Sequence, residues 1–124
     1  MHLPEELKYT KDHEWTRIDG ETAVVGITDY AQSELGDIVY VELPEVGTSV
    51  KQGESFGTIE AVKAVSDLYA PVSGEVIAVN DKLNDSPELV NRDPYGEGWM
   101  IKIKMADPAE LEKLLDKSQY EALL

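Results

Sequence analysis

The chain has 124 residues, which suits one domain able to bury about two-thirds of its unfolded surface, so we expect residues 1–124 to form a single domain. It carries 11 basic and 25 acidic residues, a formal charge of −14. This charge argues against nucleic acids and anionic membranes as partners, because both bind clustered Lys and Arg. The negative charge is more compatible with a partner protein that carries a basic patch.

The chain has no cysteine, which excludes disulfides, thiolate metal sites and cysteine nucleophiles. His2 and His13 are too few for a multi-histidine metal site, so we expect no metal. No apolar run has the length of a membrane span, and the N-terminal segment lacks a basic stretch followed by an apolar one. We therefore expect a cytoplasmic protein, with the mitochondrial matrix, after removal of a transit peptide, as the alternative.

Five short segments are rich in apolar and β-branched residues and are bounded by Gly, Pro, Asn or Asp. We expect them to form strands; they are residues 23–27, 37–43, 57–62, 74–79 and 99–105. The last alternates most clearly, with lysines on one face and apolar groups on the other. Short strands at this close spacing predict a mainly β fold, as a sandwich or small barrel.

Helices are expected at the edges of this β body. Residues 28–36 have an N-cap residue in Thr28 and a terminal glycine in Gly36. In the tail, Asp107 is an N-cap residue followed by Pro108 at the first helical position and Glu110 at the third. Its apolar face would hold Leu111, Leu114 and Leu115, and a second capped turn would start at Ser118.

Lys63 lies between two apolar stretches, with no Gly, Asn or Pro beside it. A lysine at the tip of a hairpin is ordinarily a solubilising turn residue. A hairpin can also hold a lysine out on a rigid turn, where another enzyme attaches a prosthetic group to it. The spacing leaves both interpretations open.

The residues around Lys63 resemble a known attachment motif. Residues 60–64, Glu-Ala-Val-Lys-Ala, resemble that of lipoyl and biotinyl carrier domains. Biotinyl carriers usually have Met on both sides of the lysine, whereas Val62 and Ala64 match the lipoyl type. Further blocks extend the likeness: residues 9–15, 26–32, 35–39, 43–47, 70–76, 86–91 and 93–100. From about Leu7 to Leu124 the chain resembles the glycine cleavage system H-protein family.

The resemblance implies a lipoyl/biotinyl-type β-sandwich, or barrel-sandwich hybrid, with a short internal helix and C-terminal helices. It also implies a lipoyl-bearing shuttle rather than an enzyme, with lipoate in an amide bond to Lys63. The arm would accept an aminomethyl group from the pyridoxal-phosphate glycine decarboxylase (P protein) and present it to the tetrahydrofolate-dependent aminomethyltransferase (T protein). Dihydrolipoamide dehydrogenase (L protein) would reoxidise the arm, and a lipoate or octanoyl transferase or ligase would load it. Free access for these partners favours a monomer.

Three acidic residues are candidate site residues beside Lys63. An aminomethyl-loaded arm would end in an ammonium group, and we hypothesise that Glu14 and Asp67 hold it. The alternative is that Glu14 is a surface residue of a strand and Asp67 caps a turn. Glu60 is either a residue that the lipoate-attaching enzyme recognises or a solvent-facing strand position. His13 and Trp15 are expected to be structural.

Other functions remain as alternatives. A biotinyl carrier is disfavoured by the missing methionines, and a lipoyl domain of a 2-oxoacid dehydrogenase complex by the absence of a flexible linker. The chain could instead donate lipoyl or octanoyl groups in protein lipoylation, or act by binding partners alone. The sequence contains no nucleophile, metal or cofactor motif that would support an independent enzyme.

Overall fold

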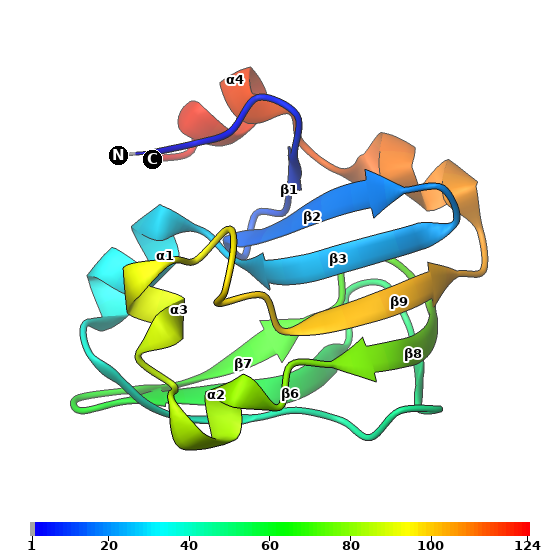
Figure 1. Ribbon diagram of the computed structural model, residues 1–124. Coiled ribbons are helices and arrows are strands. Elements are labelled where there is room, and N and C mark those ends of the chain that lie inside the picture. The colour runs from blue at the N-terminus through cyan, green and yellow to red at the C-terminus, as the bar shows by residue number, and fades with distance from the viewer. Residues whose placement is uncertain (1) are drawn as a thin grey trace.

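The computed structural model describes residues 2–124, so Met1, the first residue of the segment assessed for a targeting signal, lies outside it. Two antiparallel sheets form the body (Figure 1). The larger has the strand order β1-β2-β3-β9-β8-β5 and the smaller the order β4-β6-β7. The strands are β1 Lys8–Tyr9, β2 Glu14–Asp19, β3 Thr22–Ile27, β4 Ile38–Glu42, β5 Ser49–Val50, β6 Ser55–Ala61, β7 Val65–Tyr69, β8 Gly74–Val79 and β9 Ile101–Met105.

The core lies between the two sheets because each sheet turns one apolar face inward. In β9, Ile101 and Ile103 are buried while Lys104 is exposed, as the alternation of its residues predicts. Val25 from the larger sheet and Ile59 from the smaller belong to the same buried cluster. No strand pair among residues 2–124 joins the sheets, so the sandwich is unclosed. The predicted mainly β sandwich is confirmed.

All five predicted strands are present, with ends that shift by up to two residues. Strand β7 pairs with β6 and completes the hairpin around Lys63. Strand β2 was not predicted, because its burial does not alternate. Its first three residues are buried and its last three are exposed, so the sequence shows no period of two.

Helix α1, Asp29–Leu35, has the predicted ends. The Thr28 hydroxyl oxygen accepts a hydrogen bond from the Ala31 N–H at 3.2 Å. Gly36 has a φ of 81° and donates its N–H to the Gln32 carbonyl at 3.0 Å. Helices α2, Lys82–Asp85, and α3, Leu89–Arg92, were not predicted, since a single turn is too short to show helical periodicity.

The tail differs from its prediction in two respects. Residues Pro108–Lys113 form a 3-10 helix capped by Asp107, and Glu110 instead accepts hydrogen bonds from Ser73, at 2.7 Å from its N–H and 2.8 Å from its hydroxyl. Helix α4, Lys117–Glu121, starts after Asp116 rather than at Ser118, because Asp116 and Gln119 form a capping box.

The C-terminal segment covers the N-terminal edge of the larger sheet (Figure 1). Tyr9 and Leu115 exchange two backbone hydrogen bonds of 2.7 Å, and the rings of Tyr9 and Tyr120 stack with centroids 4.8 Å apart. Within residues 2–124, no helix has the length and apolar character that crossing a bilayer requires.

Candidate functional site

Lys63 lies at the tip of the β6–β7 hairpin and is exposed to solvent. The Ala61 N–H donates to the Ala64 carbonyl at 2.8 Å, which closes the turn. The Val62 N–H donates to the Asp37 carbonyl at 3.2 Å, which ties the turn to the segment before β4. The Lys63 side chain therefore projects from a base held by two strands and a neighbouring loop.

Three cavities that share lining residues lie between Lys63 and the start of β2. The tip cavity, of about 420 Å³, is lined by Val62, Lys63 and residues 33–37. The central cavity, of about 350 Å³, lies among α1, the start of β2 and the β6–β7 hairpin, and shares Glu34 and Leu35 with the tip cavity. The far cavity, of about 240 Å³, shares Asp12 and Glu14 with the central one. The tip cavity at Lys63 and the central cavity at Glu14 are therefore neighbours.

The central cavity combines apolar walls with acidic groups. The apolar lining is Ile27, Ala31, Leu35, Ile59 and Leu68, and the acidic lining is Asp12, Glu14, Glu34 and Asp67. None of its lining residues within 2–124 is a lysine or arginine. Such a surface suits a ligand with an apolar stretch and a cationic end, because the walls bury the first and the carboxylates attract the second.

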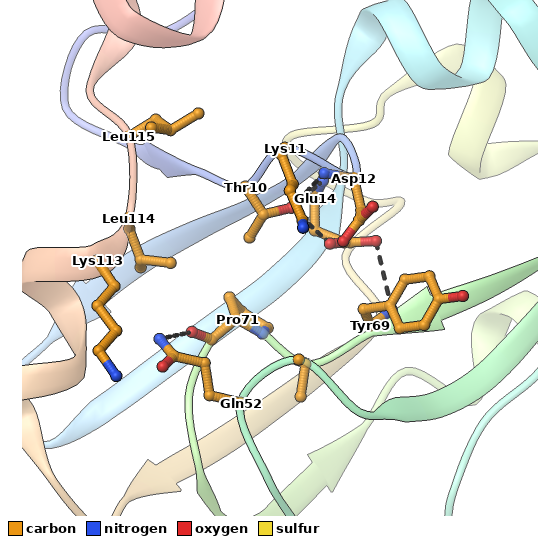
Figure 2. Close-up of a pocket in the computed structure, with 12 residues that line it drawn as sticks. Thr10, Lys11, Asp12, Glu14, Gln52, Tyr69, Pro71, Lys113, Leu114 and Leu115 are labelled. Carbon is orange, nitrogen blue, oxygen red and sulfur yellow. Dashed lines mark hydrogen bonds between the residues drawn. The ribbon is translucent and has the colours of Figure 1, made fainter.

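Glu14 is the most buried of these acids, with 2 % of its surface exposed. Its Oε1 accepts a 2.6 Å hydrogen bond from the Thr10 hydroxyl, and its Oε2 accepts one of 3.3 Å from the Tyr69 N–H (Figure 2). Burial raises the pKa of the carboxyl to about 8, against the smaller lowering effect of these two bonds. The alternative of a surface position for Glu14 is wrong, although the residue does begin a strand.

Asp67 lines the same central cavity, so the structure brings the two predicted acids to one site. It differs from Glu14 because it is exposed. It lies within β7, opposite Thr58, rather than at a turn, and its Oδ1 is 3.5 Å from the Ser55 hydroxyl.

Glu60 is not among the residues that line these cavities. It is half-buried on β6 and lies directly between Tyr40 of β4 and Val65 of β7. Directly opposed residues share one face of a sheet. Tyr40 is 47 % and Val65 67 % exposed, so Glu60 belongs to a row on the outer face of the smaller sheet, beside the Lys63 turn.

His13 and Trp15 flank Glu14, and the structure gives them different surroundings. Trp15 is fully buried and its Nε1–H donates to the Pro94 carbonyl at 2.9 Å, a structural role as expected. His13 is half-buried and lines the central cavity. Thr10 and Tyr30 also contribute to the site. Sequence reasoning missed these two. The Thr10 hydroxyl bonds to Glu14 only four residues along the chain, in the loop before β2, and Tyr30 reaches His13 from α1; neither contact has a periodic pattern that marks it.

Comparisons with known proteins identify the family of the chain. The family model described as "Glycine cleavage H-protein" matches residues 7–124. A glycine cleavage system H protein of Anaeromyxobacter sp. (strain K) is 60 % identical over 124 residues, 100 % of this chain and 97 % of that protein. One from Geobacillus kaustophilus is 59 % identical, over 100 % of this chain and 98 % of its own length.

A solved structure is similar as well. The crystal structure of a glycine cleavage system H protein from Mycobacterium marinum superposes with a TM-score of 0.89 at 42 % identity, covering 97 % of each chain. The family model covers nearly the whole chain, and the relatives match it almost from end to end. The chain belongs to the glycine cleavage H-protein family.

Proposed function

We propose that the chain is the lipoyl-bearing shuttle of a glycine cleavage system, with lipoate in an amide bond to Lys63. The observation that carries this proposal is the exposed Lys63 on a rigid turn, with neighbouring cavities between it and the buried carboxyl of Glu14. Lipoate would supply an apolar arm and two redox sulfurs, which a cysteine-free chain lacks. The apolar walls and acidic lining of the central cavity fit such an arm with an amine at its end.

The arm would meet several partners in turn. It accepts an aminomethyl group from the P protein, presents it to the T protein and is reoxidised by the L protein. A lipoate or octanoyl transferase or ligase loads Lys63. The exposed hairpin tip gives each partner access, which supports a monomer, and the net charge of −14 favours partners with basic patches. The bacterial relatives support a cytoplasmic location.

Glu14 and Asp67 would hold the ammonium end of the loaded arm. Glu14 is buried and, with its pKa raised to about 8, mostly protonated near neutral pH. An arriving ammonium lowers that pKa, since an adjacent cation favours the carboxylate. The pair that forms is shielded from water, which slows hydrolysis of the loaded arm. Exposed Asp67 would contribute from the rim of the same cavity.

Glu60 would act earlier, when the arm is attached. It lies on the outer face beside the Lys63 turn, between exposed Tyr40 and Val65. An enzyme that covers Lys63 from that face would contact Glu60 but not Glu14. We therefore assign Glu60 to recognition by the lipoylating enzyme.

The test is the intact mass of the chain after incubation with lipoate, ATP and a lipoate ligase, followed by peptide mapping. We expect one lipoyl group, on Lys63. Lys63→Arg should abolish the adduct, and Lys104→Arg, at another exposed lysine, should not. No adduct, or a biotinyl group on chains purified from cells, would overturn the proposal.

Two further measurements address the alternatives. Transfer of a labelled octanoyl group from Lys63 to another lipoyl domain would add a donor role to the shuttle role. Turnover of glycine by the purified lipoylated chain, without the other proteins, would contradict the assignment as a non-enzymatic carrier.

A further inference from the structure

Three side chains form a buried hydrogen-bond chain behind the central cavity. The Tyr120 hydroxyl of α4 lies 2.7 Å from the Nδ1 of His13 and 2.8 Å from the hydroxyl of Thr28, the N-cap residue of α1. Tyr120 and Thr28 are fully buried. His13 has a left-handed φ of 71°, which only its surroundings can stabilise. The C-terminal helix thus reaches a residue of the site.

The donor and acceptor in each of these hydrogen bonds follow from the groups that each hydroxyl has within reach. The Thr28 oxygen accepts from the Ala31 N–H at 3.2 Å, and its own hydrogen needs an acceptor because it is buried. Tyr120 is the partner within reach, so Thr28 donates to Tyr120 and Tyr120 donates to His13 Nδ1. The opposite direction leaves the Thr28 hydrogen without an acceptor among the described residues.

This direction sets the tautomer of His13. A neutral imidazole that accepts at Nδ1 carries its hydrogen on Nε2. Burial lowers the pKa of His13, against the weaker effect of Asp12 and Glu34, and raises that of Tyr120 to about 12, so both rings are neutral near pH 7. Within residues 2–124 no acceptor contacts Nε2, and the ring lines the central cavity beside Tyr30, with centroids 4.9 Å apart. The Nδ1 edge faces Tyr120, so the Nε2 edge points away from it.

We infer that His13 is a binding residue for the arm. Its Nε2–H donates a hydrogen bond to one sulfur of the reduced arm, the sulfur to which no aminomethyl group is attached. Tyr120 is the positioning residue that holds His13 in this tautomer. The inference rests on the proposed function. Besides methylenes, the arm has an amide at its Lys63 end and two sulfurs at its far end. His13 adjoins Glu14 in the central cavity, so the sulfurs are the acceptors that arrive there.

The two neighbours would recognise different parts of one group. Glu14 would take the amine, and His13 the sulfur that stays free. A thiol is a weak acceptor and a thiolate a strong one, so the bond favours the thiolate. This arrangement discriminates the reduced arm from the oxidised ring, whose sulfurs carry no charge.

The first experiment needs no lipoate. In the unmodified chain labelled with ¹⁵N-histidine, we expect His13 to show an unprotonated Nδ1 and a protonated Nε2. The other histidine, His2, is exposed and serves as an internal reference. Tyr120→Phe keeps the ring stacked on Tyr9 but removes the hydroxyl, and it should give a mixture of tautomers. A protonated Nδ1 in the parent, or no change in Tyr120→Phe, would overturn the assignment of Tyr120.

The second experiment titrates the thiols of the reduced, lipoylated chain by thiolate absorbance. We expect about tenfold more thiolate at a given pH in the parent than in His13→Asn. Asn tolerates the left-handed φ but places its amide at the δ position. His13→Gln returns a donor near the ε position and should recover most of the difference. Equal titrations in all three chains would overturn the sulfur contact.

The two proposals fail separately. If the mass measurement shows that the chain takes up no lipoate, the proposed function is disproved. His13 then has no sulfur acceptor either. A chain that is lipoylated but titrates alike with and without His13 disproves only the inference about His13.

Discussion

Glu14 shows how one side chain obtains its properties from parts of the chain far apart in sequence. Thr10 bonds one carboxyl oxygen and Tyr69, 55 residues along the chain, bonds the other. Both bonds lower the pKa of Glu14, yet desolvation prevails and raises it to about 8. A carboxyl with this pKa is neutral when alone and ionises beside a cation, which is the behaviour that capture and release of an amine require.

Removal of the acids should shorten the life of the loaded arm. We predict that Glu14→Gln speeds release of formaldehyde and ammonia from it by about tenfold, because one buried charge-assisted bond contributes roughly 1.4 kcal/mol or more. Asp67→Asn should have a smaller effect, since Asp67 is exposed. Both products are measured in reactions that contain no T protein. Release no faster than in the parent would refute the role of these two acids.

The raised pKa of Glu14 also predicts how stability depends on pH. The folded chain keeps a proton on Glu14 up to about pH 8, whereas the unfolded chain loses it near 4.5, the ordinary pKa of a glutamate. The contribution of Glu14 to the free energy of unfolding is therefore full below pH 4.5. Between pH 4.5 and about pH 8 it falls by up to about 1.4 kcal/mol per pH unit. Urea unfolding of Glu14→Gln should lack this component. Glu60→Gln serves as the control and should follow the parent.

Glu60 gives a kinetic prediction. If the lipoylating enzyme contacts the outer face beside Lys63, Glu60→Gln should lower kcat/KM for lipoylation by about tenfold, the effect of one hydrogen bond to a charged group. The stability of the chain should stay within about 0.5 kcal/mol, since the residue is half-buried on a sheet face. Glu42→Gln, an exposed acid on the neighbouring strand, is the matched comparison. Equal loss in both variants would indicate general charge effects rather than recognition.

At the scale of elements, the caps decide where helices begin. The sequence offers several N-cap residues in the tail, and the structure uses Asp107 and Asp116 but not Ser118. Serine is a common N-cap residue, yet the chain is already helical at Ser118. Asp116 Oδ1 accepts from the Gln119 N–H at 2.8 Å, and the Gln119 side chain accepts from the Asp116 N–H at 3.0 Å.

This choice of cap is testable by stability. We predict that Asp116→Ala lowers the free energy of unfolding by about 1 kcal/mol, because a lost N-cap leaves backbone donors without a partner. Ser118→Ala should change it by less than about 0.5 kcal/mol, as expected for an exposed helical position. Equal losses in urea titrations of the two variants would favour a helix start at Ser118.

At the scale of the molecule, the net charge of −14 has two consequences. It favours association with basic surfaces over acidic ones, and it destabilises the compact state by self-repulsion. Only two ion pairs occur within residues 2–124, Lys82–Glu97 at 2.9 Å and Lys117–Glu5 at 3.9 Å, so most acids are not locally neutralised.

Salt should therefore stabilise the fold. Between about 0.01 M and 0.15 M NaCl the Debye length falls from about 30 Å to about 8 Å. We predict a rise in Tm on the order of 3 °C, measured by calorimetry. A variant with three exposed acids neutralised, Glu54→Gln, Glu75→Gln and Glu112→Gln, should respond less. A Tm that falls with salt would show that the ion pairs outweigh the repulsion.

The amino-acid sequence was sufficient to predict the family, the mainly β class, five of the strands, the ends of α1 and the hairpin around Lys63. These are local or periodic features: alternation marks strands, Thr28 and Gly36 mark a helix, and a motif surrounds Lys63. They depend on residues that are neighbours along the chain.

Three features follow from tertiary packing only: Glu14 is buried, Glu60 is not among the cavity residues, and His13 bonds to Tyr120. Strand β2 lacks an alternating pattern because its first half is covered on both faces, and single-turn helices are too short for a period. The site itself joins residues 107 positions apart, as in the His13–Tyr120 bond. Such contacts follow from how the two sheets and the C-terminal helix pack, which no local pattern encodes.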